Sequence, residues 1–173
     1  MTTTLRADAE RNRGLILEAA RSVFAEQGLD AGVAEIAERA GVGVGTIFRR
    51  FPCKEDLLVA IVEARVSEIV GFARSASTFR EFMHEATALH IGDRCLCESV
   101  GTAVFDRPEL RAARDDAREA VGALLLRAQH AGEVRQDVTV DDVPVILLGI
   151  ARAAPPVGWE RYLDFALAGL RPS

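Results

Sequence analysis

The sequence predicts an all-α protein, and two observations support that prediction. Apolar residues recur at spacings of three and four along most of the 173 residues, and glycine or proline separates the segments that carry this pattern. The sequence has no run rich in valine, isoleucine and threonine that alternates with polar residues between hairpin turns. We therefore expect helices packed on helices, without a sheet.

Four helices are expected in the N-terminal part of the chain. The apolar residues of the first keep helical spacing until Gly28, where that helix should stop. Two short helices follow, and Phe51 should end the second of them because the residue before a proline disfavours the α region. A longer helix comes next. The expected bounds are residues 8–27, 33–39, 44–50 and 54–75.

The remainder of the chain also alternates helical patterns with residues that break helices. Pro108 and Pro144 suit the first turn of a helix, and Gly132 suits a helix end. The expected bounds here are residues 78–91, 93–105, 108–131, 140–154 and 157–170. We expect two domains, residues 1–52 and residues 53–173.

Residues 33–57 have the spacing of a helix-turn-helix that runs into a third helix. Ala37 offers a small side chain where two short helices would cross, and Gly41 can adopt the positive φ that the turn needs. Ile47 returns an apolar side chain to the inside. These three residues predict a tight crossing of the helices on either side of Gly41.

The same segment carries a longer pattern, which starts in the preceding helix. Its members are Ile16, Ala19, Ala20, Phe24, Gly28, Ile36, Ala37, Ala40, Gly41, Val42, Gly45, Thr46, Phe51, Lys54 and Leu57. In these positions the first third of the chain resembles the DNA-binding end of the TetR family of transcriptional regulators. Beyond about residue 75 the chain resembles that family only in its helical layout.

The resemblance implies that the helix over residues 44–50 lies in the major groove of DNA, with Ile47 facing inward. We expect Arg49 or Arg50 to contact bases, because an arginine can bond both O6 and N7 of guanine. The sequence leaves open which of the two does so. The expected DNA-binding residues are Val44, Gly45, Thr46, Phe48, Arg49, Arg50 and Lys54.

Other contacts of this region would be made to the DNA backbone. Gly45 would let the main chain approach a phosphate, Thr46 could bond a phosphate or touch a thymine methyl group, and Lys54 would meet a phosphate by charge. The net charge of −5 does not favour DNA binding by itself. The cations are nevertheless segregated around the recognition helix, while the acidic residues of the two preceding helices could face solvent or pair with Arg21 and Arg39.

Four positions depart from the family pattern. Gly43 stands where Ser or Thr usually precedes the recognition helix, so a side-chain cap is lost. Phe48 replaces a tyrosine and offers no hydroxyl to a phosphate. Cys53 replaces a capping threonine, and Gly32 stands where a capping residue is often found. We expect these changes to lower the affinity for DNA.

The resemblance also implies an effector pocket and a dimer interface in the C-terminal part. The effector is unidentified, and a small, mostly apolar molecule is the default. The expected pocket residues are Phe72, Phe79, Phe82, Met83, Leu96, Phe105 and Leu124, with plain core as the alternative. The expected interface residues are Val145, Leu148, Gly149, Arg152, Tyr162, Phe165, Ala166 and Gly169, with intrachain core as the alternative.

Several other chemistries find little support in the sequence. Gly41, Gly43 and Gly45 do not have the spacing of a nucleotide-binding loop. The paired carboxylates, GxSxG and HExxH patterns that would indicate an enzyme are missing from the sequence. We expect no cofactor and no bound metal, although His90, Asp93, Cys95, Cys97 and Glu98 form a ligand-like group.

Location and redox state follow from what the sequence lacks. No apolar run is long enough to span a bilayer, and the N-terminus lacks the apolar stretch of a signal peptide. We therefore expect a cytoplasmic protein without membrane contact. In that reducing compartment Cys53, Cys95 and Cys97 would be free thiols.

The hypothesis from sequence is a TetR-like homodimer that binds a roughly palindromic double-stranded operator and represses transcription until a small effector binds. Repression is taken from the resemblance. Two alternatives stay open. The first is a helical ligand-binding or interaction protein with little DNA affinity, and the second is a regulator that senses a metal or thiol oxidation.

Overall fold

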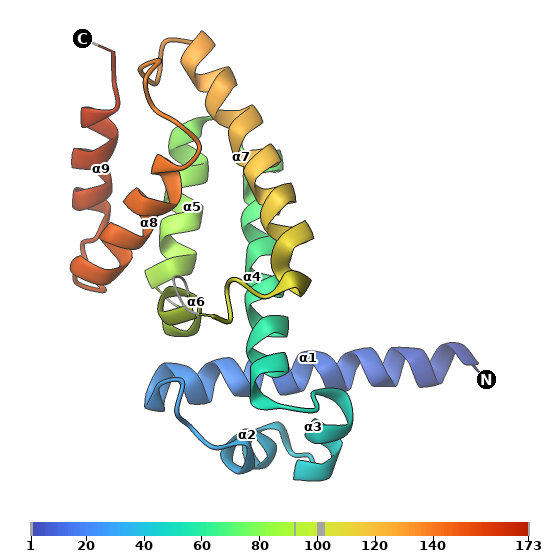
Figure 1. Ribbon diagram of the computed structural model, residues 1–173. Helices are drawn as coiled ribbons and strands as arrows, with labels where there is room; N and C mark the ends of the chain where they lie inside the picture. The colour runs from blue at the N-terminus through green and yellow to red at the C-terminus, as the bar shows by residue number, and fades with distance from the viewer. Residues whose placement is uncertain (1, 92, 100–102, 173) are drawn as a thin grey trace. The chain divides into compact units, whose positions relative to one another are not determined.

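The computed structural model describes residues 2–91, 93–99 and 103–172, with the backbone alone described at residues 2–10 and 94–96. Within these residues every regular element is a helix, which confirms the all-α prediction (Figure 1). The α-helices are α1 (Thr2–Gln27), α2 (Val33–Ala40), α3 (Val44–Arg50), α4 (Lys54–Ser75), α5 (Phe79–Ile91), α6 (Arg94–Ser99), α7 (Arg111–His130), α8 (Asp142–Ala153) and α9 (Glu160–Gly169). A 3₁₀ turn, η1 (Pro108–Leu110), precedes α7.

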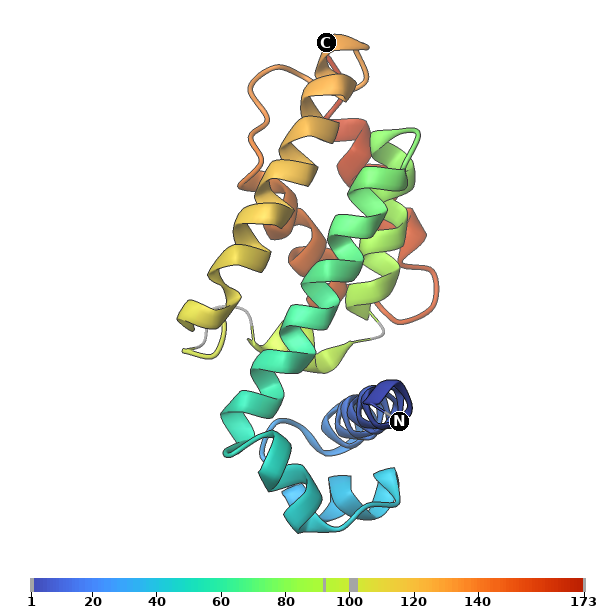
Figure 2. The same ribbon diagram turned by 90° about the vertical axis from the view of Figure 1, so that its right-hand side faces the viewer.

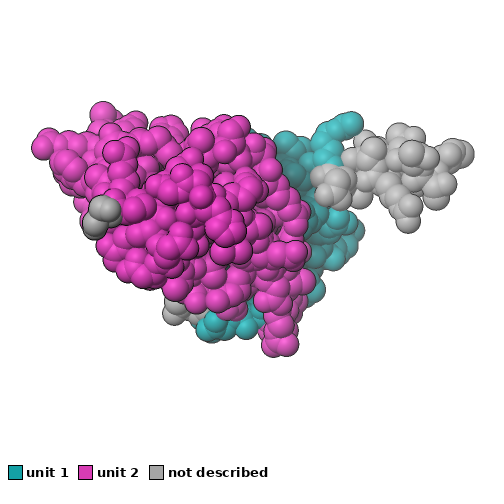
Figure 3. Space-filling view, turned by 90° about the horizontal axis from the view of Figure 1, so that it is seen from above, with its two compact units in different colours: residues 1–62, 94–107 teal, residues 63–93, 108–173 magenta. Residues whose placement is uncertain are grey.

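The chain forms two compact units, which Figure 3 colours separately. The first unit consists of residues 1–62 and 94–107, and the second of residues 63–93 and 108–173. The division falls within α4, which contributes residues to both units. The functional boundary that the sequence suggested lies earlier, after residue 52, and it stays a prediction.

The first unit is built around the crossing of α2 and α3. At the end of α2, Gly41 has φ 67° and ψ 29°, the left-handed conformation that a side chain with a β-carbon rarely adopts. The N–H of Gly41 donates to the carbonyl of Glu38, and the N–H of Val42 donates to that of Ala37. These two hydrogen bonds together form a Schellman motif, which ends α2 and turns the chain toward α3. The roles predicted for Ala37, Gly41 and Ile47 are thereby confirmed, since Ala37 and Ile47 are both buried.

One apolar core joins α1, α2, α3 and the start of α4. Helix α1 packs on α2, and α2 packs on α3 (Figures 1 and 2). The fully buried side chains of this core include Ile16, Phe24, Ile36, Ile47, Leu57 and Ile61. Because α1 and α4 supply much of this core, they fix the position of α3.

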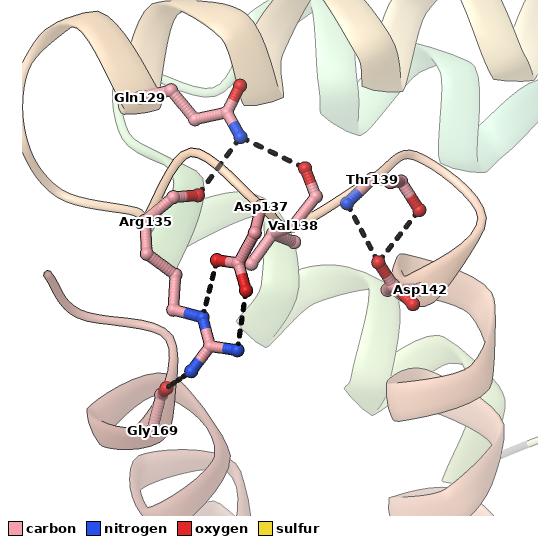
Figure 4. Close-up of polar contacts among 7 residues, drawn as sticks. All are labelled: Gln129, Arg135, Asp137, Val138, Thr139, Asp142 and Gly169. Atoms are coloured by element: carbon pink, nitrogen blue, oxygen red, sulfur yellow. Dashed lines mark hydrogen bonds and ion pairs between the residues drawn. The ribbon is translucent and has the colours of Figure 1, made fainter.

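In the second unit, helix α5 contacts α7, α8 and α9 (Figure 2). The segment between α7 and α8 has no regular structure of its own, and side chains hold it in place (Figure 4). Gln129 donates one amide hydrogen bond to the carbonyl of Arg135 and another to that of Val138, both at 3.0 Å. The carboxylate of Asp142 accepts hydrogen bonds from the backbone N–H and the hydroxyl of Thr139, as in one half of a capping box.

The predicted helix over residues 93–105 is wrong. Helix α6 ends at Ser99, and residues 103–106 form a turn. The apolar pattern continues at Val104 and Phe105 and does not by itself register that residues 103–106 form a turn before Pro108. The start of the next helix also differs, since residues 108–110 form the 3₁₀ turn η1 before α7 begins.

Two serine substitutions should change stability in opposite directions. Gly32 precedes α2 in an extended conformation with open space around its α-carbon, so Gly32→Ser should gain a side-chain cap and raise the melting temperature by about 1–2 °C. Gly41→Ser also meets open space, but its left-handed backbone should lower the melting temperature by about 3–6 °C. Thermal unfolding followed by circular dichroism measures both. Equal shifts in the two variants would contradict the assigned role of Gly41.

Candidate nucleic-acid interface

Helix α3 buries one of its seven residues, Ile47, which is 1% exposed. The side chains of Val44 and Phe48 are 39% and 45% exposed, and Arg49 and Arg50 also face solvent. A short helix held through one side chain leaves most of its circumference available to a partner. This exposure is what a helix that enters a DNA groove requires.

The polar groups around α3 come from the helix itself and from the start of α4. Arg49 donates a hydrogen bond of 3.2 Å to the hydroxyl of Thr46, one turn earlier, so its guanidinium lies along the helix. The ammonium of Lys54 lies 5.7 Å from the centre of the buried Phe24 ring, within the range of a cation–π contact. Lys54 is half-buried, and Thr46 is half-buried as well.

An ion pair braces the helix-turn-helix from α1. Arg39 at the end of α2 contacts both carboxylate oxygens of Glu26, at 2.5 and 2.8 Å, and also donates to the hydroxyl of Ser22. The hydrogen bond from Arg39 lowers the pKa of Glu26. The sequence raised the possibility that Arg39 pairs with an acidic residue of the preceding helices, and the structure confirms it.

The predicted loss of side-chain caps is also confirmed. Neither Gly32 before α2 nor Gly43 before α3 provides a side-chain hydrogen bond to its helix. Cys53 precedes α4 and stays a thiol more readily than a free cysteine does. The backbone of Asp56 favours its thiolate, but the carboxylates of Asp56 and Glu55, together with burial, outweigh this effect and raise the pKa of Cys53. A protonated thiol reacts slowly with oxidants, so this environment does not favour redox sensing at Cys53.

The residues predicted for an effector pocket fall into three groups. Phe79, Phe82, Met83 and Leu124 are fully buried in the core of the second unit, and Phe72 packs against that core. Phe105 belongs to the first unit, so the division into units does not group it with the others. The side chain of Leu96 lies outside the described residues.

The surface of the second unit is hollowed on both sides of the start of α5. One hollow of about 420 Å³ includes Phe79 together with Val134 and Leu167. A second of about 440 Å³ lies between α5 and α9 and is lined mainly by charged side chains, including Glu81 and Asp164. Neither hollow is lined by the buried residues Phe82, Met83 and Leu124, so the predicted effector pocket stays a prediction.

The ligand-like group around Asp93 has other partners. The carboxylate of Asp93 accepts a hydrogen bond of 2.5 Å from Arg65 in α4, and both side chains are buried. His90 donates from Nδ1 to the carbonyl of Ala86, and its burial lowers the pKa of the imidazole. Where side chains are described, no three His, Cys, Asp or Glu residues are grouped as a metal site requires. Cys95 lies outside the described side chains.

Arg65 is a buried cation that no sequence motif indicated. It lies on α4 one turn after Ile61 and one residue before Val66, which are both buried, so its position on an apolar stripe was the available signal. Besides Asp93, it contacts Glu68 at 2.6 Å. A buried arginine needs a carboxylate partner, but the sequence does not indicate which one across a distance of 28 residues.

The residues predicted for a dimer interface lie on the outer sides of α8 and α9. Within the single chain all eight are exposed or half-buried, and none belongs to the buried core. Val145 is 69% exposed and Phe165 is 60% exposed, with the guanidinium of Arg161 lying 5.3 Å from the Phe165 ring. Ala166 packs against the core of the second unit from a half-buried position, and the dimer interface stays a prediction. Separately, none of the described helices is long and apolar enough to cross a membrane.

Comparison with known proteins identifies both parts of the chain. The sequence model of the tetR family of bacterial regulatory proteins matches residues 16–61. A second model, described as the C-terminal domain of SbtR-like transcriptional regulators, matches residues 74–172, which is more than half of the chain.

Individual proteins agree with the two family models. A TetR transcription regulatory protein from Mycobacterium vanbaalenii is 35% identical, with 97% of this chain and 99% of that one aligned at a TM-score of 0.68. A gamma-butyrolactone receptor described as ArpA-like is 27% identical, with 95% and 90% aligned and a TM-score of 0.68. The transcriptional activator FasR of Mycolicibacterium smegmatis is 36% identical over 72 residues, or 41% of this chain. That match spans a third of FasR's length.

Together with the geometry of α2 and α3, these matches define a transcription regulator with an N-terminal helix-turn-helix of the DNA-binding type and a C-terminal domain of the SbtR-like type. The chain belongs to the TetR family. That family consists of regulators of transcription and not of enzymes.

Proposed function

We propose that this protein is a homodimeric repressor that binds a roughly palindromic operator and is released from it by a small, mostly apolar effector. Residues 1–52 would carry DNA binding, and residues 53–173 would carry effector binding and dimerisation. The observation that supports this proposal most strongly is the exposure of α3, which is anchored through Ile47 and presents its other side chains to solvent.

The DNA contacts follow from the chemistry of the exposed side chains. Arg49 and Arg50 are the base-reading candidates, since a guanidinium can bond guanine at two atoms. Thr46 and Lys54 would meet phosphates. A β-carbon added to Gly45 would find no atom of the protein within 4 Å, so packing within the protein does not require a glycine there. We attribute the missing side chain to close approach of the backbone to DNA.

Dimerisation would use the exposed faces of α8 and α9. A two-fold axis lets the same apolar patch cover itself, and it places two recognition helices on one side of the DNA. One helix of the length of α3 reads too few base pairs to select a site in a genome. The apolar exposure at Val145, Tyr162 and Phe165 supports this surface over other parts of the second unit.

An apolar effector is proposed from the composition of the second unit's core. Phenylalanine, methionine and leucine side chains of α5 and α7 pack in this core, and the ArpA-like relative is named as a gamma-butyrolactone receptor. Effector binding there would act on α4, which contributes to both compact units. A small change in the spacing of two recognition helices would weaken operator binding, because half-sites are about 34 to 36 Å apart. FasR is named as an activator, so the sign of regulation needs its own test with the promoter.

The alternative is a helical ligand-binding or interaction protein with little DNA affinity. The uncapped starts of α2 and α3 favour it, because each missing cap weakens the element that must dock in the groove. Metal or thiol sensing is a second alternative. The Asp93 to Arg65 pair and the raised pKa of Cys53 count against it.

Replacing both arginines of α3 should abolish specific DNA binding and leave the fold intact. Arg49→Ala with Arg50→Ala removes the base-reading candidates, and each lost bidentate contact is worth about 1–3 kcal/mol. Fluorescence anisotropy measures the loss of operator affinity. The operator is taken from the DNA that flanks the protein's own coding sequence, and nonspecific competitor DNA is present. Arg111→Ala with Arg114→Ala, two exposed arginines of α7, removes the same charge and should keep specific binding. Unchanged operator affinity in the α3 variant would contradict the site assignment.

A charge in the middle of the α8 and α9 face should separate the dimer. Phe165→Glu places a carboxylate where two apolar faces would meet, and we expect light scattering to report a monomer at concentrations at which the unchanged protein is a dimer. Val157→Glu is the matched control, since Val157 is more exposed but lies outside the predicted interface. A dimer that persists in the Phe165 variant and dissociates in the control would place the interface elsewhere.

A further inference from the structure

Two large apolar side chains of the recognition helix lie outside the apolar core of the first unit. Val44 and Phe48 are exposed, and neither belongs to the apolar core of the first unit, whereas Val42 just before them packs against it. Exposed large apolar residues are few in the described part of the chain, and two of them lie on this seven-residue helix. Two such side chains within one short helix form an exposed apolar patch, and a patch of this kind indicates a partner.

The positions of these two side chains restrict what the partner can be. Residues four apart lie on the same side of a helix and about 6 Å apart along it. Arg49 and Arg50 follow directly in the sequence, and Lys54 begins the next helix, so cationic residues lie close to the apolar pair along the chain. An apolar pair with cationic residues close to it is suited to the floor of the DNA major groove, because phosphates line the groove edges and the C5-methyl group of thymine is the apolar group on its floor.

We propose that Val44 and Phe48 read thymine methyl groups and so determine part of the operator sequence. This inference rests on the proposed function and names the bases that the site takes. Successive bases on one strand rise by about 3.4 Å, so side chains about 6 Å apart reach bases about two steps apart. Each half-site should therefore contain two thymines at about that separation, with guanine nearby for an arginine.

The absence of a hydroxyl on Phe48 agrees with this role. A tyrosine at this position would bring a polar group that needs a hydrogen-bond partner, whereas phenylalanine can cover a methyl group with its whole ring. Arg49 is held along the helix by its hydrogen bond to Thr46, one turn before it. The two apolar side chains and the arginines can therefore address different atoms of neighbouring base pairs.

The test uses the full-length protein and an operator obtained by selection from random duplex DNA. Each thymine of the operator is replaced in turn by deoxyuridine, which removes one methyl group and keeps the base pair. For the unchanged protein we expect affinity to fall about 3- to 5-fold at two positions of each half-site, as expected for one buried methyl group. Replacing cytosine by 5-methylcytosine at other positions controls for general effects of groove hydrophobicity.

Variants assign each methyl group to a side chain. Phe48→Ala should abolish the uracil penalty at one position, and Val44→Ala should abolish it at the other. Phe48→Leu, which stays apolar, should keep part of it. Leu15→Ala is the matched control, because Leu15 is an equally exposed apolar residue of α1 and should leave both penalties unchanged.

The possible outcomes separate this inference from the function on which it rests. Specific operator binding without any uracil penalty, or with penalties that persist in both alanine variants, would overturn the methyl readout and leave the regulator intact. If selection recovers no specific DNA at all, the proposed function fails and the inference fails with it. Penalties that disappear one by one with the matching variant would support both.

Discussion

The left-handed turn at Gly41 is the constraint on which the DNA-binding part of this protein depends. It lets α2 and α3 cross closely over Ala37, and it directs Ile47 into the core shared with α1 and α4. Without that turn α3 would need more of its own surface to stay attached. A single buried anchor therefore explains both why α3 is held and why nearly all of it remains available to a partner.

Because α3 has a single buried anchor, its position depends on the elements that pack around it. Gly32 and Gly43 supply no caps, so α2 and α3 gain little stability from their own ends. The buried side chains of α1 fix α2 from outside the motif, and the exposed pair between Arg39 and Glu26 adds a second link between these two helices. We expect a recognition helix that is ordered by its surroundings, which is consistent with a DNA affinity that depends on the whole N-terminal unit.

The sequence predicted those features that local chemistry determines. The bounds of α3 and α4, the turn at Gly41 and the missing caps all follow from residues that lie close together in the chain. The pair between Arg65 and Asp93 could not be predicted, because its partners are far apart in sequence and only tertiary packing brings them together. Phe105 shows the same limit, because its apolar character does not indicate which compact unit contains it, and the division of the chain places it in the first unit as a half-buried residue.

Hydroxyl-radical footprinting can show whether the exposed face of α3 reads the major groove as one of a symmetric pair. The DNA would be the region upstream of the protein's own coding sequence or an operator obtained by selection. The account predicts two protected patches related by two-fold symmetry and centred about one helical turn, roughly 34 to 36 Å, apart on one face of the duplex. Protection of a single patch, or uniform weak protection along the DNA, would contradict it.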